Sequence, residues 1–173
     1  MRAYFLKTLS LLTLVVLMQS CSVETDSYQI ETPVLVLNAT GPLFEGSNTA
    51  TATWEFTLEE LFPDVEGDII VHKAKVSSIN IQPKGEEDFP KVDKMVMEIK
   101  SKYINMTRIG LLESNIQVGK EYSLSVADKQ EEIATALQDE RITFVADFDM
   151  IDEEYYEDLS FDLVVSFEVE VRK

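Results

Sequence analysis

The C-terminal part of the chain has the clearest alternation of apolar and polar residues. Leu159, Phe161 and every second residue onward to Val171 are apolar, and of the residues between them only Val164 is apolar. Such a long alternation indicates a β-strand with one buried and one solvent-exposed face. A strand of this kind is stable only within a sheet that a second layer covers.

Shorter stretches of the same alternation predict further strands. The strongest lie within residues 49–58, 94–100, 121–126 and 141–148, and weaker ones within residues 34–37, 68–76, 78–82 and 108–112. The pattern predicts seven to nine strands, most of them with one polar face. Polar faces of this kind favour antiparallel sheets over a parallel sheet that is covered by helices.

One or two short helices are predicted between the strands. Thr57 and Glu60 have the spacing of a helix capping box, and residues 130–140 suit a short connecting helix. The sequence has no internal repeat and no second domain boundary. We therefore expect residues 33–173 to form one all-β domain, an antiparallel β-sandwich of immunoglobulin-like architecture.

The N-terminal stretch has the pattern of a signal peptide. Arg2 and Lys7 give it positive charge, and a ten-residue apolar stretch, residues 9–18, follows. A membrane-spanning helix needs about 20 apolar residues, so this stretch is too short for a stable anchor. Its length and the position of its charges predict that residues 1–20 are a signal peptide that is removed.

The residues after this apolar stretch resemble the cleavage motif of a bacterial lipoprotein, in the looser form found in Bacteroidota. They are Leu17-Met18-Gln19-Ser20-Cys21. The strict motif has Leu, Val or Ile where Met18 stands and a smaller residue where Gln19 stands. The resemblance implies cleavage before Cys21, a diacylglyceryl group on its sulfur and acylation of the new amino terminus. It implies nothing about the folded domain.

An acylated Cys21 would tie the protein to a lipid bilayer. Each buried acyl CH₂ contributes about 0.8 kcal/mol, so two or three chains anchor a protein where one chain is marginal. We therefore expect the protein to be attached to the outer membrane of the cell envelope. Whether it lies on the periplasmic or the surface face is left open. Residues 21–32 would then be the lipidated cysteine and an acidic tether. The alternatives are an uncleaved signal anchor and a secreted protein with a free thiol.

The charge of the chain excludes one large class of partner. It has 15 Lys+Arg, 32 Asp+Glu and a formal net charge of −17, which becomes −19 without Arg2 and Lys7. Nucleic-acid binding requires a basic surface, and anionic lipid headgroups would repel so acidic a domain. The single cysteine excludes an intrachain disulfide framework and any multi-cysteine metal site.

The densest acidic segment, residues 147–158, is a candidate for calcium binding because calcium prefers many oxygen ligands. It lacks the glycine and the Asp spacing of an EF-hand loop, so we interpret it as a solvated hairpin loop. Tyr155 and Tyr156 lie in the same segment, and an exposed tyrosine beside carboxylates could stack on a sugar ring. Adjacent strand residues point to opposite sides, so at most one of the two would do so. Trp54 is expected in the core.

No catalytic, cofactor-binding or metal-binding residue is assigned. His72 could pair with Ser77 or Ser78, but its surroundings do not resemble a nucleophile elbow. We therefore expect a non-catalytic envelope lipoprotein whose domain gives structural support or binds an envelope protein. One alternative is a carbohydrate-binding accessory lipoprotein that uses the loop at residues 150–158. A more remote alternative is a hydrolase that uses a pair of carboxylates.

Overall fold

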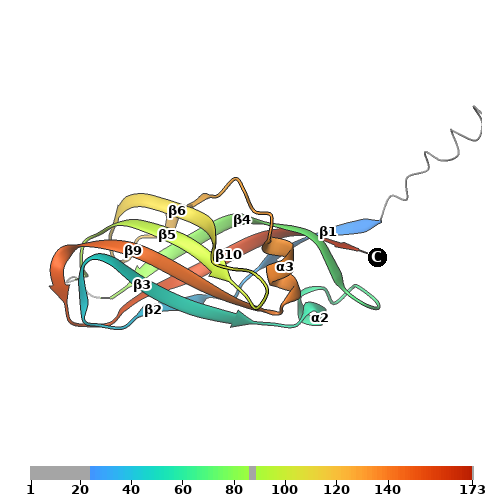
Figure 1. Ribbon diagram of the computed structural model, residues 1–173, viewed down its shortest axis with the longest axis horizontal. Helices are drawn as coiled ribbons and strands as arrows, with labels where there is room; N and C mark the ends of the chain where they lie inside the picture. The colour runs from blue at the N-terminus through green and yellow to red at the C-terminus, as the bar shows by residue number, and fades with distance from the viewer. Residues whose placement is uncertain (1–23, 86–88, 173) are drawn as a thin grey trace, which may run out of the picture.

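The computed structural model describes residues 24–85 and 89–172, most of which are in antiparallel strands (Figure 1). The strands are β1 (Thr25–Glu31), β2 (Leu35–Ala39), β3 (Leu43–Glu55), β4 (Ile70–Lys84), β5 (Val92–Lys100), β6 (Thr107–Ile116), β7 (Tyr122–Ser123), β8 (Ser125–Val126), β9 (Arg141–Tyr155) and β10 (Leu159–Arg172). The helices are α2 (Leu58–Leu61) and α3 (Ile133–Gln138). The predicted all-β antiparallel fold with two short helices is confirmed. The strand count within the described residues is ten: β1 and the division into β7 and β8 were not predicted, whereas the two segments predicted at residues 68–76 and 78–82 form one strand, β4.

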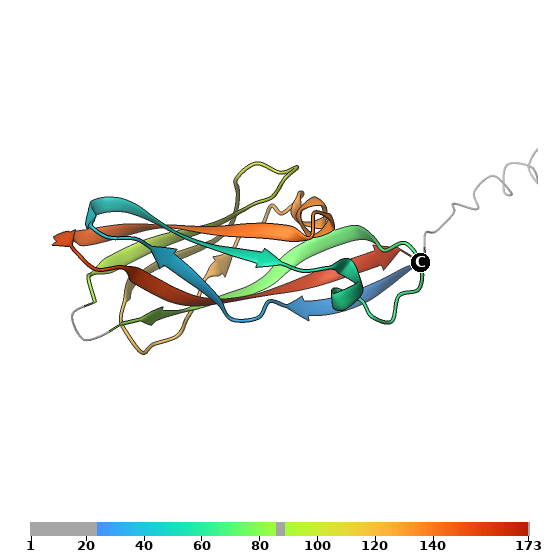
Figure 2. The same ribbon diagram turned by 90° about the horizontal axis from the view of Figure 1, so that it is seen from below.

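The strands form one continuous sheet in the order β7-β4-β10-β2-β3-β9-β5-β6-β8, and β1 pairs with β10 beside this path. The two ends of the order, β7 and β8, are halves of one segment, residues 122–126. Between them the Leu124 N–H donates to the Ile79 carbonyl oxygen at 2.9 Å. The sheet therefore curls into an elongated, nearly closed barrel that is flattened into two layers (Figure 2).

The inner face of β10 is the one that the alternation predicted. Its seven inward side chains, Leu159, Phe161, Leu163, Val165, Phe167, Val169 and Val171, are each at most 2% exposed. Aromatic rings of the opposite layer pack against them. The Phe148 and Phe161 ring centroids lie 5.6 Å apart, and those of Trp54 and Phe167 lie 6.2 Å apart. Trp54 is buried in the core, as expected.

The acidic tether predicted for residues 21–32 is wrong over most of its length. Residues 25–31 are strand β1, which pairs with β10 from Thr25 opposite Arg172 to Glu31 opposite Ser166. Ile30 is buried, and the Tyr28 ring lies 5.1 Å from that of Phe62. Two apolar residues gave too weak an alternation to predict the strand, and the edge of β10 supplies the hydrogen bonds that order it. The folded domain thus includes residues 25–32, which the prediction left out.

Between β1 and β2, Thr32 continues the hydrogen bonding to β10. Pro33 cannot donate a backbone hydrogen bond, so regular strand pairing is interrupted there. The buried Thr32 fills the gap: its N–H donates to the Val165 carbonyl oxygen at 3.0 Å, and its hydroxyl accepts from the Val165 N–H at 3.1 Å. One edge of β10 is therefore covered along almost its whole length by β1, Thr32 and β2.

The two helices are short and have local or supporting roles. The predicted capping box of α2 is confirmed, because the Thr57 hydroxyl accepts from the Glu60 N–H and the Glu60 carboxylate accepts from the Thr57 N–H. The Glu140 carboxylate, just after α3, accepts from the Leu58 N–H at 2.8 Å and so connects the two helical regions. Neither helix in the described part of the chain has the length and apolar character needed to cross a bilayer.

Two glutamine side chains cover the edge of β4 that faces away from β10. Gln138 accepts from the Val71 N–H at 3.0 Å and donates to the Ile69 carbonyl oxygen at 3.3 Å. Gln130 makes the same pair of bonds to the N–H and carbonyl of Val76. Because an amide has one donor group and one acceptor, each glutamine replaces a residue of a neighbouring strand. The α3 segment therefore closes the barrel where no strand pairs with β4.

We expect Gln138→Leu to lower the free energy of unfolding by about 1–3 kcal/mol, because it removes two hydrogen bonds to partly buried backbone groups. Urea denaturation followed by tryptophan fluorescence measures the change. The matched control is Gln82→Leu, an exposed position on the same strand, for which we expect a change within about 0.5 kcal/mol. Equal losses in the two variants would contradict this role of Gln138.

Candidate functional site

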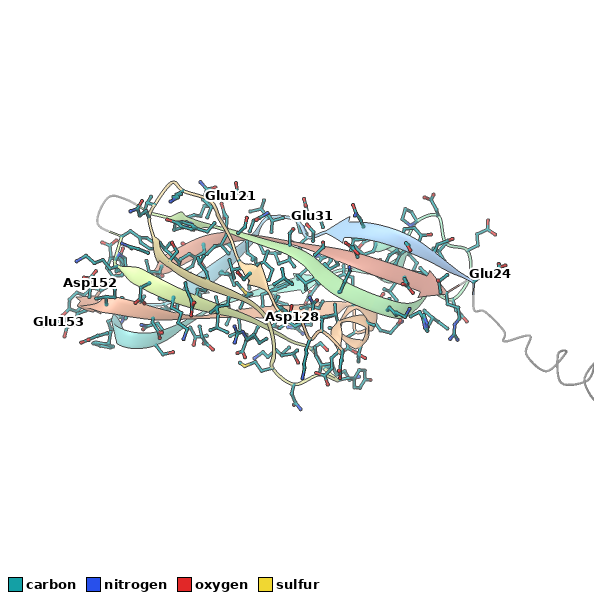
Figure 3. The ribbon with its side chains drawn as sticks, turned by 90° about the horizontal axis from the view of Figure 1, so that it is seen from above. Glu24, Glu31, Glu121, Asp128, Asp152 and Glu153 are labelled. Carbon is teal, nitrogen blue, oxygen red and sulfur yellow. The ribbon has the colours of Figure 1, made fainter. Side chains whose placement is uncertain are left out.

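Different segments of the chain form the two ends of the barrel. Thr25 pairs with Arg172, so the start of β1 and the end of β10 lie together at one end. The β2–β3 turn, residues 40–42, and the β9–β10 turn, residues 156–158, lie at the opposite end, which we call the tip (Figures 1 and 2). In Figure 3, Glu24 marks the first end, and Asp152 and Glu153 lie near the tip.

The two turns of the tip are built against each other. The Gly41 N–H donates to the Asp158 carboxylate at 2.9 Å. A Cβ atom at Gly41 would lie only 2.7 Å from the carbonyl oxygens of Tyr156 and Glu157, so no larger residue fits without a backbone shift. Close contact with backbone atoms, which cannot rotate away, explains why glycine stands at this position.

Several apolar side chains at the tip are exposed to solvent and are not packed in the core. Tyr156 is 74% exposed, Phe44 is 53% exposed and Ile151 is 51% exposed. Tyr155, by contrast, packs partly against the core, so the two adjacent tyrosines do point to different sides, as predicted. The Tyr156 hydroxyl donates to the Glu154 carboxylate, and this hydrogen bond raises the pKa of the tyrosine. The tip thus presents an aromatic ring beside a carboxylate.

The acidic segment at residues 147–158 is mostly strand, and the hairpin loop predicted there is wrong in extent. Strand β9 continues to Tyr155, so only residues 156–158 form the turn. Alternation along β9 separates neighbouring carboxylates onto two faces. The Asp152 carboxylate accepts from the Lys91 N–H at 2.7 Å, which attaches β9 to the start of β5. Within the described ranges, no three His, Cys, Asp or Glu side chains come together as a metal site would require.

One pair of carboxyl groups does meet on the outer face of the sheet. Glu98 on β5 and Asp147 on β9 share a side-chain hydrogen bond, and the Thr49 hydroxyl also donates to Asp147 at 2.7 Å. Partial burial raises the pKa of Glu98, the charge and hydrogen bond of Asp147 raise it further, and Arg108 opposes the shift. Glycosidases separate their two carboxyl groups by about 5–9.5 Å, so a directly hydrogen-bonded pair does not fit either of their mechanisms.

The raised pKa of Glu98 predicts a pH-dependent loss of stability. An acid whose pKa is higher in the folded state than in the unfolded state lowers the stability of the fold at pH values at which it is ionised. For Glu98, this loss of stability disappears as the pH falls below the ordinary glutamate pKa of 4.5. We expect Glu98→Gln to be more stable than the wild type at pH 7, by less than about 1 kcal/mol. Thermal unfolding at several pH values should show this difference shrinking in acid.

Glu121→Gln is the matched control, because this exposed turn residue also loses one negative charge. We expect its stability to stay within about 0.5 kcal/mol of the wild type at each pH. The same pH-dependent gain in both variants would show that net charge, and not contact with Asp147, causes the effect.

The other residues singled out from the sequence are separated from one another or lie outside the described ranges. Cys21 and residues 1–20 lie outside them. His72 is exposed on β4, whereas the Ser78 hydroxyl donates to the Ser166 hydroxyl at 3.0 Å. Trp54 contacts Phe56 in the core, with ring centroids 4.1 Å apart, so it is not part of a surface platform.

Comparison with known proteins gives no relative for this site. No protein-family model matches the chain, and no curated protein matches it.

The exposed Phe44 was not predicted, although it stands between the turn residues Pro42 and Gly46. Its position near a turn was the available signal, but exposure depends on the packing of β3 against β9.

Proposed function

We propose that this protein is a lipoprotein of the bacterial cell envelope, held in the outer membrane by acyl chains on Cys21. Its barrel is a non-catalytic module that gives structural support or binds another envelope protein. The observation that supports this is the position of β1, which begins at Thr25 and lies at one end of the barrel. The tip lies at the other end, where a partner can reach it.

The short connection would keep the domain close to the bilayer. Three residues separate Cys21 from Thr25, a connection that reaches at most about 14 Å between the two Cα atoms. Strand β10 has 14 residues, and at a rise of about 3.3 Å per residue the barrel extends about 45 Å from that end. Because the domain is strongly acidic, anionic headgroups repel it. Both features favour an orientation with the tip directed away from the membrane.

Replacing the cysteine tests the anchor. Cys21→Ala should abolish incorporation of radiolabelled palmitate and release the protein from the membrane fraction, because no sulfur is left to acylate. Ser22→Ala changes the next residue and keeps the cysteine, so it should retain both properties. Palmitate labelling that persists in Cys21→Ala, or an intact mass that shows a bare sulfur in the wild type, would contradict the proposal.

A second candidate function, carbohydrate binding, is supported by Tyr156. Its ring is the most exposed among the large apolar and aromatic side chains of the described residues, and the Glu154 carboxylate accepts a hydrogen bond from its hydroxyl. An exposed ring can stack on a sugar, and neighbouring carboxylates can accept hydrogen bonds from its hydroxyls. No comparable observation favours the carboxylate-pair hydrolase.

Affinity electrophoresis in gels containing envelope polysaccharide tests this candidate. We expect Tyr156→Ala to weaken retardation about tenfold, because stacking of one aromatic ring contributes roughly 1–1.5 kcal/mol. Tyr103→Ala is the control, because Tyr103 is 69% exposed but lies on the β5–β6 loop, away from the tip. If no polysaccharide retards the wild type, or if both variants lose retardation equally, carbohydrate binding at the tip is wrong.

A further inference from the structure

The loop between β5 and β6, residues 101–106, lies beside α3 (Figure 1). The Asp139 carboxylate, at the end of α3, accepts from both the Ser101 hydroxyl and the Tyr103 N–H. Ile104 is 5% exposed and anchors the loop in the core. Asp139 is therefore engaged in fixing the loop, and its contacts place the side chains around it.

This loop forms one side of a pocket that is rich in positive charge. The pocket has a volume of about 370 Å³ and is lined by Lys100, Ser101, Lys102, Asp139, Arg141 and Thr143. Half of these side chains are cations, although acidic residues outnumber basic ones in the chain by 32 to 15. Such a local reversal of charge attracts anions to a protein that otherwise repels them.

Two of the three cations of the pocket, the exposed Lys100 and Lys102, form no ion pair with a described residue, although Asp139 adds one negative charge to the lining. Other lysines of the described chain, such as Lys73 and Lys75, do form ion pairs. The Lys102 ammonium lies 4.6 Å from the centre of the Tyr103 ring. Arg141 contacts Glu55 through Nε at 3.3 Å, which leaves its two terminal amino groups to donate elsewhere.

We propose that this pocket binds the phosphate group of a ligand. A guanidinium group can donate two parallel hydrogen bonds to phosphate oxygens, and lysines add compact positive charges. The phosphate can belong to a lipid headgroup or to a soluble phosphate ester, because both present the same oxygens. The loop lies in the half of the molecule nearer to the start of β1, as Figures 1 and 2 both show. The phosphate site itself does not depend on the proposed lipid anchor.

Titration of inorganic phosphate into the isotope-labelled full chain carrying Cys21→Ala, followed by NMR, tests the site. Sodium chloride keeps the ionic strength constant during the titration. We expect shifts in the amide signals of residues 100–103 and 139–143. The double variant Lys100→Gln/Lys102→Gln should bind phosphate about tenfold more weakly, because two charge-assisted contacts are lost. The double variant Lys73→Gln/Lys75→Gln removes the same charge elsewhere and should bind as the parent chain does.

Flotation with lipid vesicles distinguishes the two sources of phosphate. If the Cys21→Ala chain floats with phosphatidylglycerol vesicles through Lys100 and Lys102, but not with phosphatidylcholine vesicles, the ligand is an anionic lipid headgroup. If inorganic phosphate binds and neither vesicle does, the ligand is a soluble phosphate ester. Binding of neither probe, or equal weakening in the two double variants, overturns the proposal.

Discussion

Strand β10 is the constraint on which the rest of the barrel depends, because its inner face and both of its edges must be covered at once. One edge pairs with β4 from Ser160 to Arg172, and the other pairs with β1 and β2. Burial of its inner side chains contributes about 10–20 kcal/mol before the entropy of ordering the chain is subtracted. That gain is available only when the opposite layer supplies rings such as Phe148 and Trp54.

Side chains complete the barrel where the strands are too few or too short to close it. Thr32 bridges the interruption at Pro33, and Gln130 and Gln138 cover the outer edge of β4. An uncovered strand edge would offer its N–H and carbonyl groups to other chains. These three polar residues remove that risk without adding another strand. Their role is structural, although the amino-acid types alone would suit a binding site equally well.

The outer surface separates into regions of different chemistry. The tip combines exposed apolar side chains with carboxylates, and the pocket beside α3 combines three cations. Between them, Glu98 and Asp147 share a hydrogen bond on the outer face of the sheet, and partial burial together with this contact raises the pKa of Glu98. If the proposed lipid anchor lies at the opposite end, the tip would be the first part of the protein to meet a partner. The pocket would lie nearer to the membrane.

The sequence by itself determined the strand at residues 159–171, the burial of Trp54 and the capping box at Thr57, because each depends on periodicity or spacing over a few neighbouring residues. Tertiary structure alone decided that residues 25–31 form a strand and that Lys100 lies beside Arg141. A strand with two apolar residues becomes ordered only when a long neighbour offers it an edge. Which charges meet depends on the order and register of strands distant in the chain, and local patterns carry no information about either.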